Sequence, residues 1–377
     1  MTPIDRSAVE QALASYQDPY LKTDLVSSGC LRSLQIDGNR VSAELVLGYA
    51  ANNIVNGIGQ MLKVAVENVP GVDSADIKVR WEVPAAPAQG SIPALANVKN
   101  IIAVASGKGG VGKSTTAVNL ALALAGEGAR VGVLDADIYG PSMGMMLGVP
   151  SGTRPQVRDQ KFFIPPQAHG VQVMTMAFLA DDNTPMAWRG PMVSGALMQL
   201  LTQTAWEDLD YLVIDMPPGT GDIQLTLAQK VPVTGSVIVT TPQDIALLDA
   251  RKGIEMFRKV NIPVLGVVEN MAVHICSNCG HAEHLFGEGG GTRLSDEYGV
   301  DLLASMPLSL MIREQADGGK PTVIAEPECQ ISMLYQDMAR HVGARIAARA
   351  AQGLGCSPKA VENALARARR KLRASAP

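Results

Sequence analysis

Short apolar runs of strand length alternate with helical segments from residue 99 onward. The apolar runs are IIAVAS (101–106), RVGVLDAD (130–137), YLVIDMPPG (211–219), GSVIVTT (235–241) and IPVLGVVEN (262–270), and the helical segments include 114–126, 222–230 and 245–259. Strands that are apolar on both faces and separated by helices are typical of a parallel sheet covered by helices on both sides. We therefore predict an α/β domain over residues 99–352, with its chemistry at the carboxyl ends of the strands.

Residues 1–82 show a different pattern. A helical segment comes first, and LRSLQIDGNRVSAELVLGY then alternates around a turn at Asp37-Gly38-Asn39, which predicts a β-hairpin. Residues 54–69 have the spacing of a second amphipathic helix, and residues 75–83 read as a third strand. The segment as a whole therefore predicts a small α+β domain.

Two further segments lack the periodicity of core elements. Residues 83–98, VPAAPAQGSIPALANV, are rich in Pro and Ala and predict a linker. Residues 353–377 form a basic tail whose positive charges are Lys359, Arg367, Arg369, Arg370, Lys371 and Arg373. The apolar face of this tail consists mostly of alanine, so we expect no stable membrane or nucleic-acid binding.

Composition narrows the class of protein. The chain has 377 residues, of which 47% are hydrophobic and 18% are charged, so it can bury a large core. The net charge of −4 argues against a globally basic nucleic-acid binder. The sequence contains no apolar run near the roughly 18 residues of a membrane span, and its N-terminus lacks a secretory signal. Five cysteines in such a chain do not predict a disulfide framework, so we expect a cytoplasmic protein.

A glycine-rich segment, SGKGGVGKST (106–115), follows the first of these strands and opens a helix. Gly107, Gly112, Lys113 and Ser114 match the phosphate-loop pattern at the required spacing. Glycines let backbone N–H groups close around phosphate oxygens, Lys113 can reach the β- and γ-phosphates, and Ser114 can bind Mg²⁺. The predicted nucleotide-binding residues are Gly107, Lys108, Gly109, Gly110, Val111, Gly112, Lys113, Ser114 and Thr115. The alternative is a glycine-rich turn without a ligand.

Aspartates end two of the predicted strands. Asp215 precedes MPPGTGD, which is the Walker B position that holds Mg²⁺ directly or through water. Asp137, in LDADIYGPS, could orient the attacking water or could cap a turn. Asp135 lies earlier on the same strand, and a structural role is equally compatible with its position.

A candidate metal site lies in HICSNCGHAEH (274–284), where Cys276 and Cys279 are two residues apart. A zinc ribbon needs a second cysteine pair about 15–20 residues away, and Cys30, Cys329 and Cys356 are single and distant. A two-fold dimer would instead bring four thiolates to its axis, enough for a [4Fe–4S] cluster or a zinc ion. Alternatives are a zinc site that includes His281 or His284, and a redox-active CxxC.

The phosphate loop carries an additional lysine, Lys108, in KGGVGKST. In this respect it resembles the deviant Walker A motif of the MinD/ParA/nitrogenase-iron-protein class of ATPases. That resemblance implies that Lys108 reaches the nucleotide of a partner subunit and that Asp137 is the switch I aspartate. It also implies that 215–219 form switch II and that Asn270, in VVENM, reads adenine. The sequence alone would also permit a solvated Lys108.

Five ordered stretches resemble the Mrp/ApbC family of iron–sulfur cluster carrier ATPases over roughly residues 99–350: SGKGGVGKST, DADIYGPS, DMPPGTGD, TTPQDIALLDARKG and VENMAVHICSNCGHAEHLFGEGGG. The resemblance implies an ATPase that uses ATP and Mg²⁺. It also implies a homodimer in which Cys276 and Cys279 of both subunits together hold a labile [4Fe–4S] cluster. It implies transfer of that cluster to apo iron–sulfur proteins. It also implies that the cluster assembly machinery is a partner. Residues 1–82 are similar to the small domain of other iron–sulfur maturation factors.

Two other functions fit parts of the sequence. A positioning ATPase of the MinD/ParA type would contact a membrane or DNA through the basic tail. An ATP-driven electron donor like the nitrogenase iron protein also bridges a cluster between subunits, but its cysteines lie far apart in sequence. The close CxxC pair and the glycines at 287 and 289–291 favour delivery of a cluster.

Overall fold

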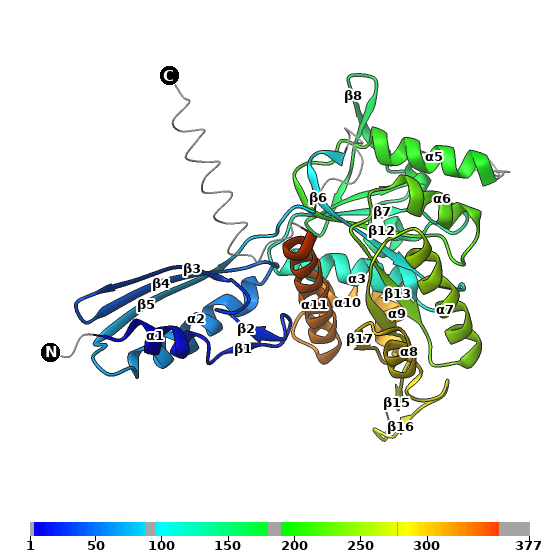
Figure 1. Ribbon diagram of the computed structural model, residues 1–377. Helices are drawn as coiled ribbons and strands as arrows, with labels where there is room; N and C mark the ends of the chain where they lie inside the picture. Colours follow the sequence, from blue (N-terminus) through cyan, green and yellow to red (C-terminus); the bar gives the residue numbers. More distant parts are fainter. Residues whose placement is uncertain (1–3, 87–94, 180–189, 277, 354–377) are drawn as a thin grey trace. The chain divides into compact units, whose positions relative to one another are not determined.

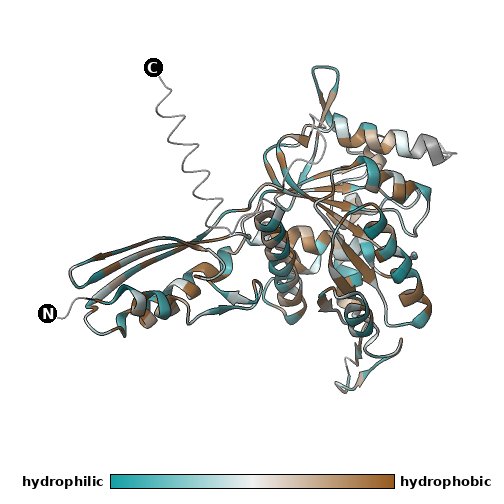
Figure 2. Ribbon diagram, viewed as in Figure 1, coloured by the Kyte–Doolittle hydropathy of each residue, from teal (hydrophilic) through white to brown (hydrophobic). Residues whose placement is uncertain are grey.

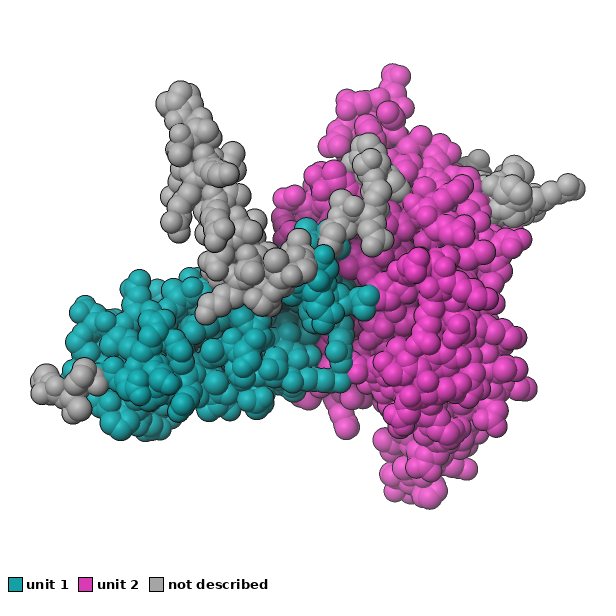
Figure 3. All heavy atoms as spheres, in the orientation of Figure 1, with its two compact units in different colours: residues 1–87, 343–377 teal, residues 88–342 magenta. Residues whose placement is uncertain are grey.

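The computed structural model describes residues 4–86, 95–179, 190–276 and 278–353 (Figure 1). The chain divides into two compact units, residues 1–87 with 343–377 and residues 88–342 (Figure 3). The cations of the predicted basic tail and residues 87–94 of the predicted linker lie outside the described residues.

Over residues 4–86, the first unit has two helices, a two-stranded sheet and a three-stranded sheet. The elements are α1 (Arg6–Leu13), β1 (Gln17–Asp18), β2 (Thr23–Asp24), β3 (Leu31–Asp37), β4 (Arg40–Leu47), α2 (Asn52–Glu67) and β5 (Ser74–Trp81). β3 and β4 form the predicted antiparallel hairpin, and Gly38 takes a left-handed φ of +56° in its turn. β5 pairs in parallel with β4, so α2 is the crossover between neighbouring parallel strands.

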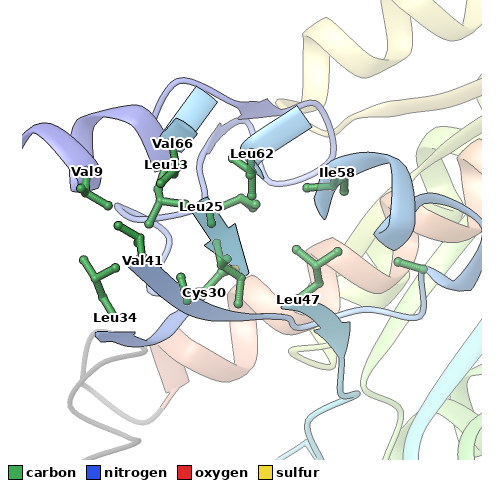
Figure 4. Packing of buried hydrophobic residues seen from close by; sticks show 14 of the residues in the cluster. Val9, Leu13, Leu25, Cys30, Leu34, Val41, Leu47, Ile58, Leu62 and Val66 are labelled. Carbon is green, nitrogen blue, oxygen red and sulfur yellow. The ribbon is translucent and has the colours of Figure 1, made fainter. Parts of the chain in front are cut away.

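Apolar side chains of α1 and α2 meet the sheet in the core of this unit (Figure 4). Ile58, Leu62 and Val66 recur every four residues along α2, which places all three on its inner face. Cys30 belongs to this core and is 6% exposed. Burial raises the pKa of the Cys30 thiol, so this cysteine is a packing residue and a poor nucleophile.

An eight-stranded sheet forms the centre of the second unit, in the order β10-β11-β7-β12-β6-β13-β14-β17. Its strands are β6 (Val98–Ala105), β7 (Val131–Asp135), β10 (Gln167–Ala168), β11 (Val171–Thr175), β12 (Leu209–Asp215), β13 (Gly235–Thr240), β14 (Val264–Glu269) and β17 (Leu302–Ser305). All neighbours are parallel except β10, which pairs antiparallel with β11. The five predicted strands are consecutive neighbours in this order, so the predicted parallel sheet is confirmed.

Helices flank this sheet, and the strands are mostly brown in the hydropathy view while much of α7 is teal (Figure 2). The helices are α3 (Lys113–Gly126), α4 (Met143–Met146), α5 (Gly190–Gln203), α6 (Asp222–Lys230), α7 (Asp244–Lys259), α8 (Gly290–Tyr298), α9 (Leu310–Asp317), α10 (Thr322–Ala325) and α11 (Gln330–Gly353). Residues 116–124 of α3 are all buried, so this helix is enclosed by its neighbours. No helix among the described residues combines the length and the apolar character needed to cross a membrane.

Two short hairpins extend from the second unit. One consists of β8 (Gln156–Arg158) and β9 (Phe162–Ile164). The other consists of β15 (His274–Ile275) and β16 (Ala282–Glu283), and it carries the CxxC pair between its strands (Figure 1). The candidate metal ligands are therefore on a projection and outside the central sheet.

Candidate functional site

The phosphate loop connects the end of β6 to the start of α3, and the backbone requires glycine at three of its positions, Gly107, Gly110 and Gly112. Gly110 and Gly112 have left-handed φ values of +81° and +82°. A Cβ on Gly107 would lie 2.2 Å from the backbone carbonyl carbon of Asp249, and one on Gly112 would lie 2.1 Å from Nδ2 of Asn270. Only glycine fits these positions. No side chain caps the N-terminus of α3, so its first N–H groups face the loop, as in phosphate-binding helices.

Lys113 and Ser114 meet the carboxylate of Asp215. Lys113 Nζ lies 2.6 Å from Asp215 Oδ1, and Ser114 Oγ donates to Asp215 Oδ2 over 2.6 Å. Asp215 is fully buried and Lys113 is 6% exposed. A lysine, a hydroxyl and a carboxylate at the N-terminus of a helix are the groups that bind nucleotide phosphates and Mg²⁺ in P-loop proteins. Thr115 follows in the first turn of the same helix.

The two aspartates after β7 have different surroundings. Asp137 Oδ2 lies 4.0 Å from Lys113 Nζ, and its side chain is 15% exposed, so it borders the phosphate site. Asp135 is 1% exposed, and its carboxylate accepts hydrogen bonds from the backbone N–H groups of Asp137, Ser142 and Met143. Asp135 thus shapes the loop on which Asp137 lies.

Burial dominates the electrostatics of these carboxylates. Burial and then the nearby charge of Asp215 raise the pKa of Asp135 to about 7. The pKa of Asp215 is also raised by burial, although the Lys113 ammonium and the hydrogen bonds from Lys113 and Ser114 oppose that rise. Burial thus disfavours the ionised form of both carboxylates, and a divalent cation beside Asp215 would be the natural counter-charge to stabilise it.

The loop after Asp215, which corresponds to the predicted switch II, is tied to the phosphate loop. Gly219 N donates to Ser106 O at 3.0 Å, and Gly219 has a left-handed φ of +97°. Gln224, at the start of α6, donates from Nε2 to the carbonyl oxygens of Pro217 and Pro218. Sequence reasoning missed Gln224, because a glutamine inside a helical pattern gives no signal that it folds back onto the preceding loop.

Lys108 and Asn270 lie at the two sides of the loop. Lys108 is half-buried and donates from Nζ to Gln243 Oε1 at 3.3 Å, next to the start of α7. Asn270 donates from Nδ2 to the Val111 carbonyl at 2.9 Å, and its backbone N–H donates to Thr240 O. Asn270 therefore contacts the phosphate loop, to which Lys108 itself belongs. The action of Lys108 on the nucleotide of a partner subunit and the contact of Asn270 with adenine stay predictions.

Cys276 and Cys279 occupy the tip of the β15–β16 hairpin. The turn is closed by hydrogen bonds from Cys276 N to His281 O and from Gly280 N to Cys276 O, both at 2.9 Å. Cys279 is exposed and Cys276 is half-buried. Hydrogen bonds from the backbone N–H groups of Cys279 and Asn278 hold the pKa of the Cys276 thiol below its usual range. A lowered thiol pKa favours the thiolate, which is the form that binds a metal.

The nearby histidines engage the backbone. His284 Nδ1 lies 2.8 Å from Ala272 O, and His274 Nδ1 lies 3.4 Å from Leu308 O. Within the described ranges, no group of three or more His, Cys, Asp or Glu side chains is arranged to hold a metal ion. The described part of one chain therefore offers a pair of thiols at this tip and no third ligand beside them.

Comparisons with known proteins identify the family of this chain. A family model described as NUBPL iron-transfer P-loop NTPase matches residues 97–343, and one described as iron–sulfur cluster assembly protein matches residues 6–79. A Pseudomonas fragi protein named iron-sulfur cluster carrier protein is 75% identical over 279 residues, which are 74% of this chain and 97% of that one. The protein of that name from Escherichia coli (strain K12) is 50% identical over 341 residues, 90% of this chain and 92% of its own.

One solved structure is similar to the second unit of this chain in sequence and fold. The nucleotide-binding protein from Archaeoglobus fulgidus, in complex with ADP, is 38% identical, with a TM-score of 0.55, and the match covers 62% of this chain and 91% of that chain. The family model spans well over half of the chain and includes the phosphate loop, Asp215 and the CxxC hairpin. The chain belongs to the ParA family of NUBPL iron-transfer P-loop NTPases.

Proposed function

We propose that this protein is an ATP-dependent iron–sulfur cluster carrier, which binds a labile [4Fe–4S] cluster between two copies of the chain and passes it to apoproteins. One observation carries the proposal: a pair of accessible thiols, with a lowered Cys276 pKa, lies on a hairpin that begins four residues after Asn270. Asn270 itself contacts the phosphate loop. The cysteines that would hold the cluster are thus connected to the phosphate loop through a short stretch of chain and the hydrogen bond of Asn270.

The residues around the loop fit Mg²⁺ and ATP. Ser114 and Asp215 are the residues that would hold Mg²⁺, and Lys113 would neutralise the β- and γ-phosphates. Mg²⁺, when bound, withdraws charge from the phosphate oxygens. Asp137 borders the same site and is suited to orient the attacking water, because its carboxylate lies 4.0 Å from Lys113 Nζ. Lys108 is proposed to reach the nucleotide of the second copy. We expect slow hydrolysis, with the nucleotide acting as a conformational switch.

The cluster is the cargo of this reaction, and its ligands come from two copies. A [4Fe–4S] cluster takes four thiolates, and each chain supplies Cys276 and Cys279. An exposed hairpin tip suits a cargo that must be handed on. The names of the relatives support the carrier role, and the partners that we propose are apo iron–sulfur proteins and the assembly machinery of the cytoplasm.

The test is metal and sulfide analysis after anaerobic reconstitution. Wild type is compared with Cys276→Ala/Cys279→Ala and with Cys329→Ala, a control at a half-buried cysteine outside the hairpin. We expect about four iron and four sulfide per dimer in wild type and in the control, and loss of both in the double variant. Zinc in place of iron, or iron retained by the double variant, would refute the bridged cluster.

A further inference from the structure

The CxxC hairpin leaves the central sheet at Glu269 and is fastened again at the same residue. The chain runs out from the end of β14, passes Cys276 and Cys279, and returns at the start of α8. There, Gly291 N donates to Glu269 Oε1 at 2.7 Å, and Ser305 Oγ donates to Glu269 Oε2 at 3.2 Å. A single carboxylate therefore holds the returning arm of the loop against β14.

This carboxylate is built into the fold. Glu269 is only 4% exposed, and a Cβ on Gly291 would lie 2.7 Å from Glu269 Cβ. The N-cap of α8 is Gly289, in a left-handed conformation and without a side-chain cap of its own. The remote Glu269 supplies that cap, because a carboxylate accepts from the free N–H groups at a helix N-terminus and is favoured by the helix dipole.

The departing arm is fixed at neighbouring points. Met306 N donates to Glu269 O, and Ala272 N donates to Met306 O, which ties this arm to the residue after β17. His284 Nδ1 contacts Ala272 O and so connects the two arms close to their base. Hydrogen bonds consequently join the two arms to each other and to Glu269 at the base of the hairpin, and we call this hydrogen-bonded base the hairpin frame.

The residue beside Glu269 holds the phosphate loop. Asn270 Nδ2 donates to Val111 O at 2.9 Å and occupies the space that a side chain on Gly112 would need. Two successive residues therefore engage the phosphate loop and the hairpin frame. A displacement of the phosphate loop that moves Asn270 also moves Glu269, and Glu269 transmits it to the returning arm at Gly291.

We propose that Glu269 is a positioning residue that makes the presentation of Cys276 and Cys279 follow the state of the phosphate loop. The inference rests on the proposed carrier function and names the part that couples its two sites. Without the carboxylate, the departing arm would still respond to Asn270. The returning arm would lose its hydrogen bond to β14, and the thiols would respond more weakly to the bound nucleotide.

Alkylation of the two thiols by iodoacetamide tests this role in the full-length apoprotein. The rate is measured on the peptide that carries Cys276 and Cys279, with and without Mg²⁺-ATP, and buried Cys30 serves as the internal reference. The variants are Glu269→Ala, the conservative Glu269→Gln, and Glu283→Gln as a control at an exposed glutamate of the same hairpin. ATP hydrolysis is measured alongside as the activity that should be retained. The side chain of Glu269 accepts hydrogen bonds from Gly291 and Ser305, which we do not assign to the phosphate site.

We expect nucleotide to change the wild-type rate by about fivefold or more, which is the usual lower range of coupling between sites. The ratio should fall towards unity in Glu269→Ala with hydrolysis retained, and it should be restored in Glu269→Gln, whose side-chain oxygen can still accept from Gly291 N. The Glu283→Gln control should behave as wild type. An unchanged ratio in a folded Glu269→Ala would overturn the inference and leave the carrier function standing.

Two further outcomes are decisive. A wild-type rate that ignores nucleotide would remove the proposed coupling itself, and the role of Glu269 with it, even if the cluster analysis succeeds. If Glu269→Ala does not fold, Ser305→Ala replaces it, because it removes one of the two hydrogen bonds to the carboxylate. That variant should show a reduced ratio, and a full wild-type ratio would contradict the inference.

Discussion

Asp215 shows how one buried carboxylate can serve several groups at the residue scale. Its two oxygens accept from Lys113 and Ser114, and its backbone carbonyl accepts from Ala136 N, so the end of β12 is joined to both α3 and the loop after β7. The neighbouring Asp135 satisfies backbone groups only. Both aspartates lie at the end of a strand, but their roles differ. Asp215 faces the phosphate site, and Asp135 holds the loop that carries Asp137.

The raised pKa of Asp135 predicts a pH dependence of stability. Its folded pKa of about 7 lies above the ordinary value of 3.8, so between these values the folded state binds a proton that the unfolded state has lost. Stability from this group is therefore greatest at low pH and falls as the pH rises towards 7, by at most about 4 kcal/mol.

Urea unfolding of wild type and Asp135→Asn between pH 4.5 and 7.5 measures this effect as a difference, which removes the contribution of acids that do not interact with Asp135. The amide keeps one oxygen to accept from the loop and does not titrate. We expect wild type to lose stability relative to the variant as the pH rises. A parallel pair of curves would show that Asp135 is ionised in the fold throughout this range.

At the scale of elements, the phosphate loop is fitted between α7 and the end of β14. Gly107 lies against the backbone of Asp249 in α7, and Gly112 lies against Asn270. The sequence predicted these glycines for their phosphate-binding role, and their second role as close-packing positions was not visible in it. The neighbours of Gly107 and Gly112 are more than a hundred residues away in the chain.

Gly112→Ala is therefore expected to destabilise the fold even without nucleotide. The added Cβ would meet Asn270 at 2.1 Å, and the φ of +82° is unfavourable for alanine, so we expect a loss of about 2 kcal/mol or more. Gly109→Ala is the matched change, because its Cβ would meet nothing nearer than Pro218 at 4.0 Å. Denaturant unfolding of both variants decides the point, and equal losses would contradict this packing role for Gly112.

A buried ion pair joins α3 to α11. Arg340 donates from Nε to Glu127 Oε1 at 2.9 Å, where Glu127 is fully buried and the Arg340 side chain is 9% exposed. Arg340→Met would leave the Glu127 charge buried without its main partner, and we expect a loss of about 3–5 kcal/mol. The double variant Glu127→Gln/Arg340→Met should recover part of that loss in thermal unfolding, since it removes the charge. A double variant as unstable as the single one would show that packing, and not charge, is responsible.

At the scale of the whole molecule, the sequence predicted the elements that have strong periodicity or a fixed motif. The five apolar runs became the consecutive strands β7, β12, β6, β13 and β14. The strands β10, β11 and β17, which lie towards the two ends of the sheet, were missed because they lack the long apolar run of a central strand. The pairings made by Gln224, Gln243 and Glu269 were missed for a different reason: they depend on which loops the fold brings together, and that information is not local in the sequence.

The proposed dimer is the assembly on which the proposed mechanism depends most. If Lys108 acts on the nucleotide of the second copy, Lys108→Ala and Asp137→Ala each inactivate the protein, but they act on different sites of a mixed dimer. The Lys108→Ala subunit keeps its own Asp137 and receives Lys108 from its partner, so one site of two is complete. Co-expression with two different tags and purification on both yields this mixed dimer, and we expect about half of the wild-type hydrolysis rate per dimer. If Lys108 instead serves the nucleotide of its own chain, both sites of the mixed dimer are defective and no activity returns.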